Sequence, residues 1–220
     1  MLLLAFDTAT PAVTVALHDG DSVVAEASTV DARRHGELLV PGIHDVLGRA
    51  GARPADLTGI AVGVGPGPYT GLRVGLATAQ ALGGTLGIPA YGLFTLDAVA
   101  CDADLPGPFL AATDARRKEV FWARYDTPLA RSTDVAVNLP ADVPAGDLPV
   151  AGPGALMYAD VFGDVHGPAH PSAAALARLA VRRLAEGGEL LPPHPVYLRR
   201  PDARVPGKPK KVRTARMSDT

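Results

Sequence analysis

The stretch GVGPGPYTGLRVGLATAQALGG, residues 63–84, constrains the fold of this 220-residue chain more than any other segment. It places two glycine-proline pairs in front of a run with helical spacing. Gly71, Gly75, Ala79 and Gly83 are four residues apart, so a helix aligns them as a ridge with almost no side chain. An interior glycine costs a helix up to about 1 kcal/mol relative to alanine, so this ridge requires a backbone packed closely against it. The sequence leaves open whether that backbone belongs to the chain's own sheet, to an earlier helix or to another subunit.

The glycine loop in front of this helix does not match the common phosphate-binding motifs. A dinucleotide fingerprint counted from Gly65 needs a glycine where Thr70 stands, and a P-loop needs a lysine that is not there. The prolines restrict φ, and Thr70 is predicted to cap the helix with its hydroxyl. Such a helix start can attract an anion, but a rigid strand-to-helix turn without a ligand explains the pattern equally well.

The segments before this loop predict a meander of strands followed by a helix. Asp19-Gly20 between β-branched runs is a strong hairpin signal, and the apolar runs lie at 2–6, 12–18 and 22–28. A helix is predicted over 35–51, with Gly51 as its C-cap and a kink or break near Pro41 and Gly42. A further strand is predicted over 59–67, ending in the glycine loop.

The first hairpin is repeated about 100 residues later. Asp7 and Asp114 each follow an apolar strand. After each of them a valine stands six positions on, an alanine nine positions on and an aspartate twelve positions on. A third strand, glycine and helix unit follows with Gly152 and Gly154, and then a helix over 171–188. Such internal repeats indicate duplicated lobes, predicted here at 1–100 and 101–200, with a basic and disordered tail at 201–220.

Several kinds of chemistry find no support in the sequence. His166 and His170 have the spacing of a zinc pair, but Gly167-Pro168 interrupts the helix that the spacing presupposes, so no metal site is predicted. No serine stands in a nucleophile elbow, which makes a hydrolase improbable. The net charge of −2 gives no overall attraction to nucleic acid, and the short arginine clusters read as solvated faces. The lack of a long apolar stretch predicts a soluble protein without a membrane span.

Five stretches of the sequence follow one another over nearly the whole chain: FDTAT, RRHGELLVPGIHDVL, GPGPYTGLRVGLATAQALG, TDARRKEVFWARY and PVYLR. Together they resemble the TsaB (YeaZ) family, which takes part in making N6-threonylcarbamoyladenosine beside the anticodon of certain tRNAs. The resemblance implies an α/β fold of the actin-like type, shared with sugar kinases and Hsp70, with two lobes. It places a nucleotide cleft, which can be vestigial, at Asp7, Thr8, Asp114, Gly152 and Gly154.

The resemblance also implies a function without catalysis in this chain. It lacks the paired-histidine metal motif of the related TsaD subunits, and its first turn lacks the glycine that active members of the superfamily use near phosphate. The implied role is a cytoplasmic scaffold, with no cofactor of its own, that binds and activates a TsaD-type catalytic subunit, assembles with a TsaE-type ATPase and meets tRNA through the complex. The implied partner surface comprises His35, Leu38, Leu39, Ile43, Thr70, Gly71, Arg73, Gly75, Ala79 and Gly83.

Two alternatives remain from the sequence. An ATP-hydrolysing enzyme of the same fold would use Asp7 and Asp114 at the phosphates. A homodimer through the same helices is expected where no TsaD-type subunit is present, because an apolar helix pair would otherwise face water. A protease has no residue support.

Overall fold

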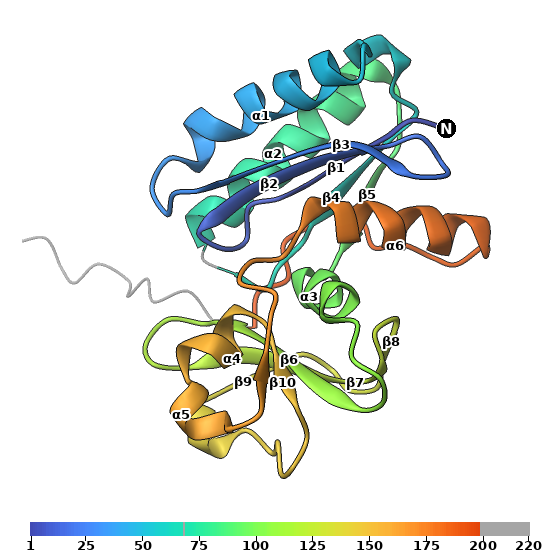
Figure 1. Ribbon diagram of the computed structural model, residues 1–220. Helices are drawn as coiled ribbons and strands as arrows, with labels where there is room; N and C mark the ends of the chain where they lie inside the picture. The colour runs from blue at the N-terminus through green and yellow to red at the C-terminus, as the bar shows by residue number, and fades with distance from the viewer. Residues whose placement is uncertain (68, 199–220) are drawn as a thin grey trace, which may run out of the picture.

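The computed structural model describes residues 1–67 and 69–198, which form two β-sheets with helices around and between them (Figure 1). The first sheet has the strand order β3-β2-β1-β4-β5. Its strands β1 (Leu3–Asp7), β2 (Ala12–His18) and β3 (Val23–Val30) form the predicted antiparallel meander. Strands β4 (Gly59–Gly63) and β5 (Ala90–Leu93) continue the sheet in parallel to β1.

Helices cover both faces of the first sheet. Alternate side chains of its strands point to opposite sides, so each face presents apolar side chains that a helix buries. Leu4 and Phe6 of β1 pack under helices α1 (His35–Arg49) and α2 (Tyr69–Leu86). Leu3 and Ala5 pack against helix α6 (Ala173–Ala185) on the other face. A short 3-10 helix, η1 (Pro54–Asp56), connects α1 to β4. This sheet and its three helices form the first lobe.

The second sheet has the order β11-β10-β6-β7-β8, with β9 paired to β7. Its central hairpin, β6 (Phe109–Asp114) and β7 (Val120–Thr127), is the predicted repeat of the first hairpin. Its other strands are β8 (Ala130–Arg131), β9 (Ala136–Asn138), β10 (Val150–Ala151) and β11 (Val165–His166). Helices α4 (Pro153–Met157) and α5 (Ala159–Phe162) cover one face, next to η2 (Pro140–Asp142), and α3 (Thr95–Ala103) covers the other.

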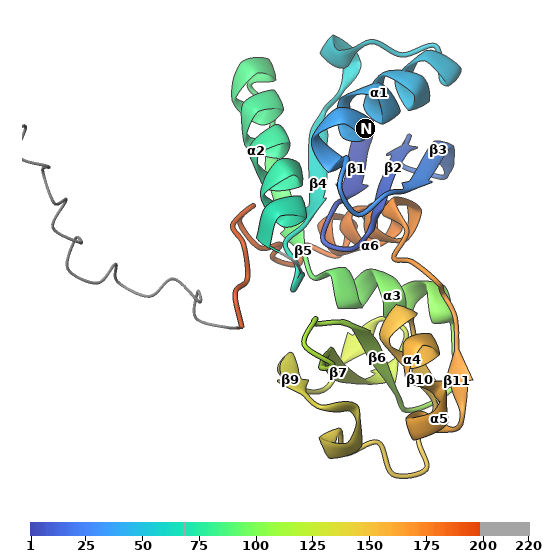
Figure 2. The ribbon, with the colours of Figure 1, turned by 90° about the vertical axis from the view of Figure 1, so that its left-hand side faces the viewer.

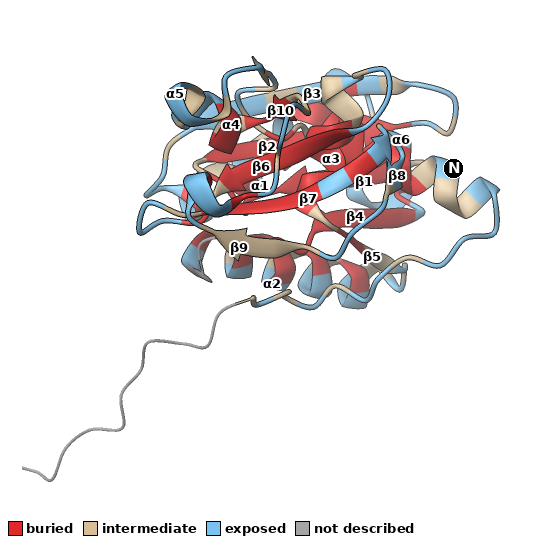
Figure 3. Cartoon of the chain, turned by 90° about the horizontal axis from the view of Figure 1, so that it is seen from below, coloured by how far each residue is buried: buried red, intermediate tan, exposed pale blue. Residues whose placement is uncertain are grey.

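The two lobes meet through helices rather than through their sheets. Figure 2 shows α3 and α6 lying between the two sheets, with α1 and α2 on the far side of the first lobe. Seen from below, the strands are largely buried, whereas α2 is buried on one side and exposed on the other (Figure 3). Helix α6 follows the second sheet in the chain but returns to pack against the first sheet. The division into lobes near residue 100 stays a proposal, and the tail at 201–220 lies outside the described residues.

Of the kink or break predicted near Pro41 and Gly42, the break into two helices is wrong. Helix α1 runs without interruption from His35 to Arg49 with Pro41 inside it. Pro41 lies on the exposed side of the helix, so the backbone carbonyl that loses its usual partner lies towards water, where the loss costs little. Leu39 and Ile43 on either side hold the helix on the sheet through their burial in the core. Gly51 has the expected positive φ of 64° just after the helix.

Candidate functional site

The turn after β1 is held by buried hydrogen bonds to Asp7. The carboxylate is 1% exposed; its Oδ1 accepts from the backbone N–H of Ala9 at 2.7 Å, and its Oδ2 accepts from the hydroxyl of Thr95 at 2.7 Å. Gly63 of β4 is so close that a side chain there would collide with Oδ2. Burial raises the pKa of Asp7, and the hydrogen bonds from Thr95 and Ala9 act in the opposite direction. The carboxylate therefore works as a structural anchor that links β1 to the start of α3.

The pKa of Asp7 gives a testable pH dependence. Because the pKa of Asp7 in the folded protein is raised above 3.8, the folded protein binds the proton more tightly than the unfolded chain does. The contribution of Asp7 to the free energy of unfolding is therefore greatest below pH 3.8. As the pH rises through the raised pKa, ionisation of the buried group should lower the free energy of unfolding. Position 7 does not titrate in Asp7→Asn. As the pH rises from 3.8 through the raised pKa, the wild-type protein should therefore lose stability relative to this variant, and at higher pH the difference between the two should be constant. Urea denaturation of both proteins across pH measures this difference, and parallel curves would contradict the account.

The glycine ridge of α2 packs against the chain's own first lobe. A side chain at Gly75 would meet Thr8 Oγ1 at 2.5 Å, and one at Gly71 would meet the backbone oxygen of Thr8 at the same distance. The Thr8 hydroxyl donates to the carbonyl of Gly71 at 2.8 Å and accepts from the N–H of Gly75 at 3.1 Å. Ala79 is fully buried, and Gly83 lies against the backbone oxygen of Ile88. The ridge as a subunit surface is therefore a wrong expectation, because the turn after β1 already occupies the close contact that the glycines permit.

Of the other residues expected at the partner surface, three, including Ile43, are buried, and three are exposed or partly exposed. His35 is 8% exposed and its Nε2 lies 2.7 Å from the carbonyl oxygen of Thr10, so it supports the same turn. Leu39 is fully buried in the core. Thr70 is exposed, but α2 begins at Tyr69, so Thr70 lies within the first turn and is not the predicted N-cap. Leu38 is partly exposed, and Arg73 is exposed with its Nε 3.3 Å from the hydroxyl of Tyr197.

The corresponding turn of the second lobe is closed by local contacts as well. Asp114 accepts from the N–H of Arg116 at 2.7 Å, and its carboxylate lies 3.3 Å from the guanidinium of the same residue. Gly152 has φ of 102°, and a side chain there would meet the carbonyl oxygen of Ala112 at 2.7 Å. Gly154 is equally close to the backbone of Ala112 and Thr113. These two glycines let α4 pack directly on β6, which accounts for them without a ligand.

The structure thus places the five predicted cleft residues in two separate sets. Asp7 and Thr8 bond within the first lobe and to α3, whereas Asp114 and the two glycines contact their own lobe. Each carboxylate has donors from the protein itself. Thr95 was missed from the sequence, since nothing local to it signals a bond to a residue 88 positions away.

An apolar groove lies on the outer side of the first lobe, between α1 and α2. It has a volume of about 390 Å³. Val40, Ile43, His44 and Leu47 of α1 line one side, and Thr78 and Leu82 of α2 line the other. Val40 is 60% exposed, which is high for a large apolar side chain. Of these residues only Ile43 belongs to the partner surface that the family resemblance implied.

Two other kinds of site are not seen in the part of the chain that the structure describes. No group of three or more His, Cys, Asp or Glu side chains there gathers closely enough to hold a metal ion. None of the described helices combines the length and the apolar character needed to cross a membrane.

The two-lobed α/β architecture with its repeated strand-turn-strand units defines an actin-like ATPase fold. Ethanolamine utilization protein EutJ from Carboxydothermus hydrogenoformans shares this fold with a TM-score of 0.51 at 12% identity, over 80% of this chain and 89% of EutJ. YeaZ from Pseudomonas aeruginosa matches with a TM-score of 0.75 at 31% identity, over 90% of this chain and 99% of that protein.

The sequence comparisons agree with the structural one. Residues 23–156 match the family model of TsaD, tRNA N6-adenosine threonylcarbamoyltransferase. An uncharacterized protein of Mycobacterium tuberculosis is 46% identical over 92% of this chain and 93% of its own length. The tRNA threonylcarbamoyladenosine biosynthesis protein TsaB of Escherichia coli is 38% identical over 57% of this chain and 55% of its own length. The chain belongs to the TsaB (YeaZ) family.

Proposed function

We propose that this protein is an accessory subunit in the synthesis of N6-threonylcarbamoyladenosine in tRNA, and that it binds a TsaD-type catalytic subunit through the groove between α1 and α2. The observation that carries the proposal is this groove, with Val40 exposed beside it, in a member of the TsaB family. Apolar side chains presented together at a surface mark interaction sites in soluble proteins. Since the glycine ridge is buried in the lobe, we place the partner on the outer faces of α1 and α2, where the apolar groove lies.

The proposed role needs no catalysis by this chain. The carboxylates of Asp7 and Asp114 accept hydrogen bonds from groups of the protein itself. The space beside Gly152 and Gly154 is occupied by the backbone of β6. In the complex, a TsaE-type ATPase and tRNA would meet the chain together with the catalytic subunit, in the cytoplasm. Without that subunit, a second copy of this chain is the expected occupant of the groove.

A reconstituted reaction tests this role. The TsaD-type subunit should transfer the threonylcarbamoyl group to tRNA only when this chain is added, and the Asp114→Asn variant should support the reaction as well as the wild-type chain does. The substitution removes the ion pair with Arg116, in which the Asp114 side chain is 14% exposed and that of Arg116 is 56% exposed, and its expected cost in stability is about 1 kcal/mol. The rival function, ATP hydrolysis by this chain, predicts that the chain alone turns over ATP and that Asp114→Asn abolishes this turnover. That pair of results would overturn the accessory role.

A further inference from the structure

Helix α3 is packed between the two lobes. Leu96 and Val99 contact the second sheet at Phe109 and Ala111. Ala98 lies on the other side, in the cluster of α6 and the first sheet. The boundary between the lobes therefore runs between α3 and α6.

Short side chains predominate on the side of α6 that packs against this cluster. Ala173, Ala174, Ala177 and Ala180 are buried there, and Leu176 and Leu179 are the larger buried side chains. Short side chains restrict the register of two packed helices less than large ones do, because they form fewer knobs and holes. A groove of about 550 Å³ also separates α6 from the β7-β8 hairpin, at Arg178 and Leu129. At this groove the two lobes are not in close contact.

Within the described residues, two ion pairs cross from α3 to α6. The Arg183 guanidinium lies 2.9 Å from Asp97, and the Arg178 guanidinium lies 2.9 Å from Asp102. The two acids are five residues apart on α3 and their arginines are five residues apart on α6, in the reverse order. This is the pattern of an antiparallel helix pair held at two points, and either pair would be broken by a shift of one turn, about 5.4 Å.

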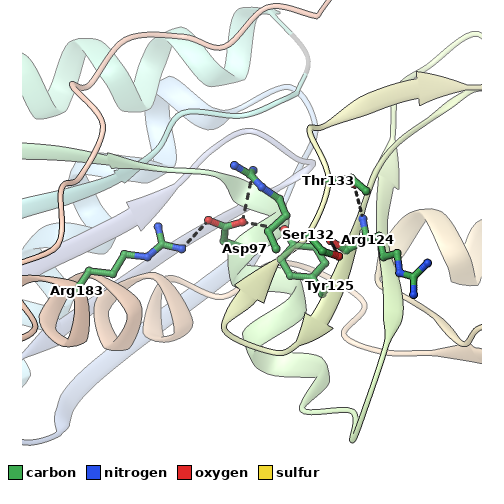
Figure 4. A network of polar contacts seen from close by, with 7 residues as sticks. Asp97, Arg124, Tyr125, Ser132, Thr133 and Arg183 are labelled. Carbon is green, nitrogen blue, oxygen red and sulfur yellow. Dashed lines mark hydrogen bonds and ion pairs between the residues drawn. The ribbon is translucent and has the colours of Figure 1, made fainter.

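The Asp97 end is tied to the second lobe as well. The Asp97 side chain is 5% exposed; it accepts from the Tyr125 hydroxyl of β7 at 2.8 Å and lies 3.6 Å from the Arg131 guanidinium of β8. Figure 4 shows Asp97 between Arg183 and Tyr125. Burial, and then the Asp97 carboxylate, raise the pKa of Tyr125, so its hydroxyl stays a donor. Arg131 also covers the ring of Phe94, at 3.9 Å from the ring centre, where the chain crosses from β5 to α3.

We propose that the pairs Asp97–Arg183 and Asp102–Arg178 form a clamp that fixes the register and the angle between the lobes. Asp97 accepts hydrogen bonds from Arg183 of α6 and Tyr125 of β7 and forms an ion pair with Arg131 of β8, and Asp102 holds the opposite end of the helix contact. The chain then behaves as one rigid body. This inference does not depend on the proposed function, since it concerns the lobes alone.

The test compares matched arginine variants of α6. Arg178→Gln/Arg183→Gln removes both clamp pairs, and Arg182→Gln removes the exposed pair with Glu186 on the same helix as the control. Dyes are placed on cysteines at the exposed positions Ala55 and Ala141, one in each lobe, after the single cysteine is removed by Cys101→Ala. Single-molecule energy transfer should give one narrow distance distribution for the wild type and the control, and a clearly broader one for the double variant. Amide exchange in α6 should be roughly tenfold faster in the double variant than in the wild type, which corresponds to a decrease of about 1.4 kcal/mol in the free energy of opening.

A purely structural role for these pairs predicts a different result. The double variant would then lose thermal stability while its distance distribution stayed narrow, and this outcome would overturn the clamp. A charge exchange, Asp102→Arg/Arg178→Asp, serves as the second check because it can rebuild the pair with reversed polarity. The distribution of dye-to-dye distances should be narrower in this exchanged variant than in Arg178→Gln alone. An equally broad distribution would show that the pair does not fix the angle between the lobes.

Discussion

Replacing Gly75 by leucine is expected to lower the free energy of unfolding by about 1–3 kcal/mol, the usual cost of overpacking a closed site. The new side chain would start 2.5 Å from Thr8 Oγ1 and would displace it. Thr8 would then lose its bonds to Gly71 and Gly75, which hold the turn after β1 against α2. Chemical denaturation followed by circular dichroism measures the loss.

The matched control is Gly84→Leu, the same change on the same helix. Gly84 is exposed and a side chain there meets nothing within 4 Å, so this variant should keep or slightly gain stability. The pair also separates two roles for the glycine ridge. If Gly75→Leu left stability unchanged and removed only partner binding, the ridge would be a subunit surface after all.

The second large effect concerns the groove between α1 and α2. Val40→Asp should weaken binding of the TsaD-type subunit by roughly a hundredfold, because a carboxylate buried without a partner in an interface costs about 3 kcal/mol. Val40 is 60% exposed in this chain, so the free protein should unfold at nearly the same denaturant concentration as the wild type. Isothermal titration calorimetry measures the affinity of this variant and of the control described next.

Val161→Asp is the control for this substitution. Val161 is 51% exposed and lies on α5 of the second lobe, away from the groove. Its variant should bind the partner like the wild-type chain. Equal affinities for Val40→Asp and Val161→Asp would exclude the groove as the docking surface.

Local sequence signals predicted the elements well. Asp19-Gly20 predicted the β2-β3 hairpin, and the apolar runs on either side predicted its two strands, because turn chemistry and strand propensity act within a few residues. The repeated Asp7 and Asp114 turns predicted two similar units, and the second hairpin is present.

Long-range packing could not be predicted in this way. The glycine ridge required a close backbone, but the sequence could not tell the turn at Thr8 from a partner. The continuous helix through Pro41 depends on the core contacts of its neighbours, which outweigh the local propensity. The bond from Arg183 to Asp97 joins residues 86 positions apart, and a charged residue in a helix gives no sign of such a distant partner.

Light scattering coupled to size-exclusion chromatography tests the central claim most directly. The wild-type chain is mixed with a TsaD-type subunit of the same organism and run beside the Val40→Asp and Val161→Asp variants. The account predicts a one-to-one complex for the wild type and for Val161→Asp, and two separate species for Val40→Asp. Separate species in all three mixtures, with the chains folded and with a TsaE-type ATPase and nucleotide present, would contradict it.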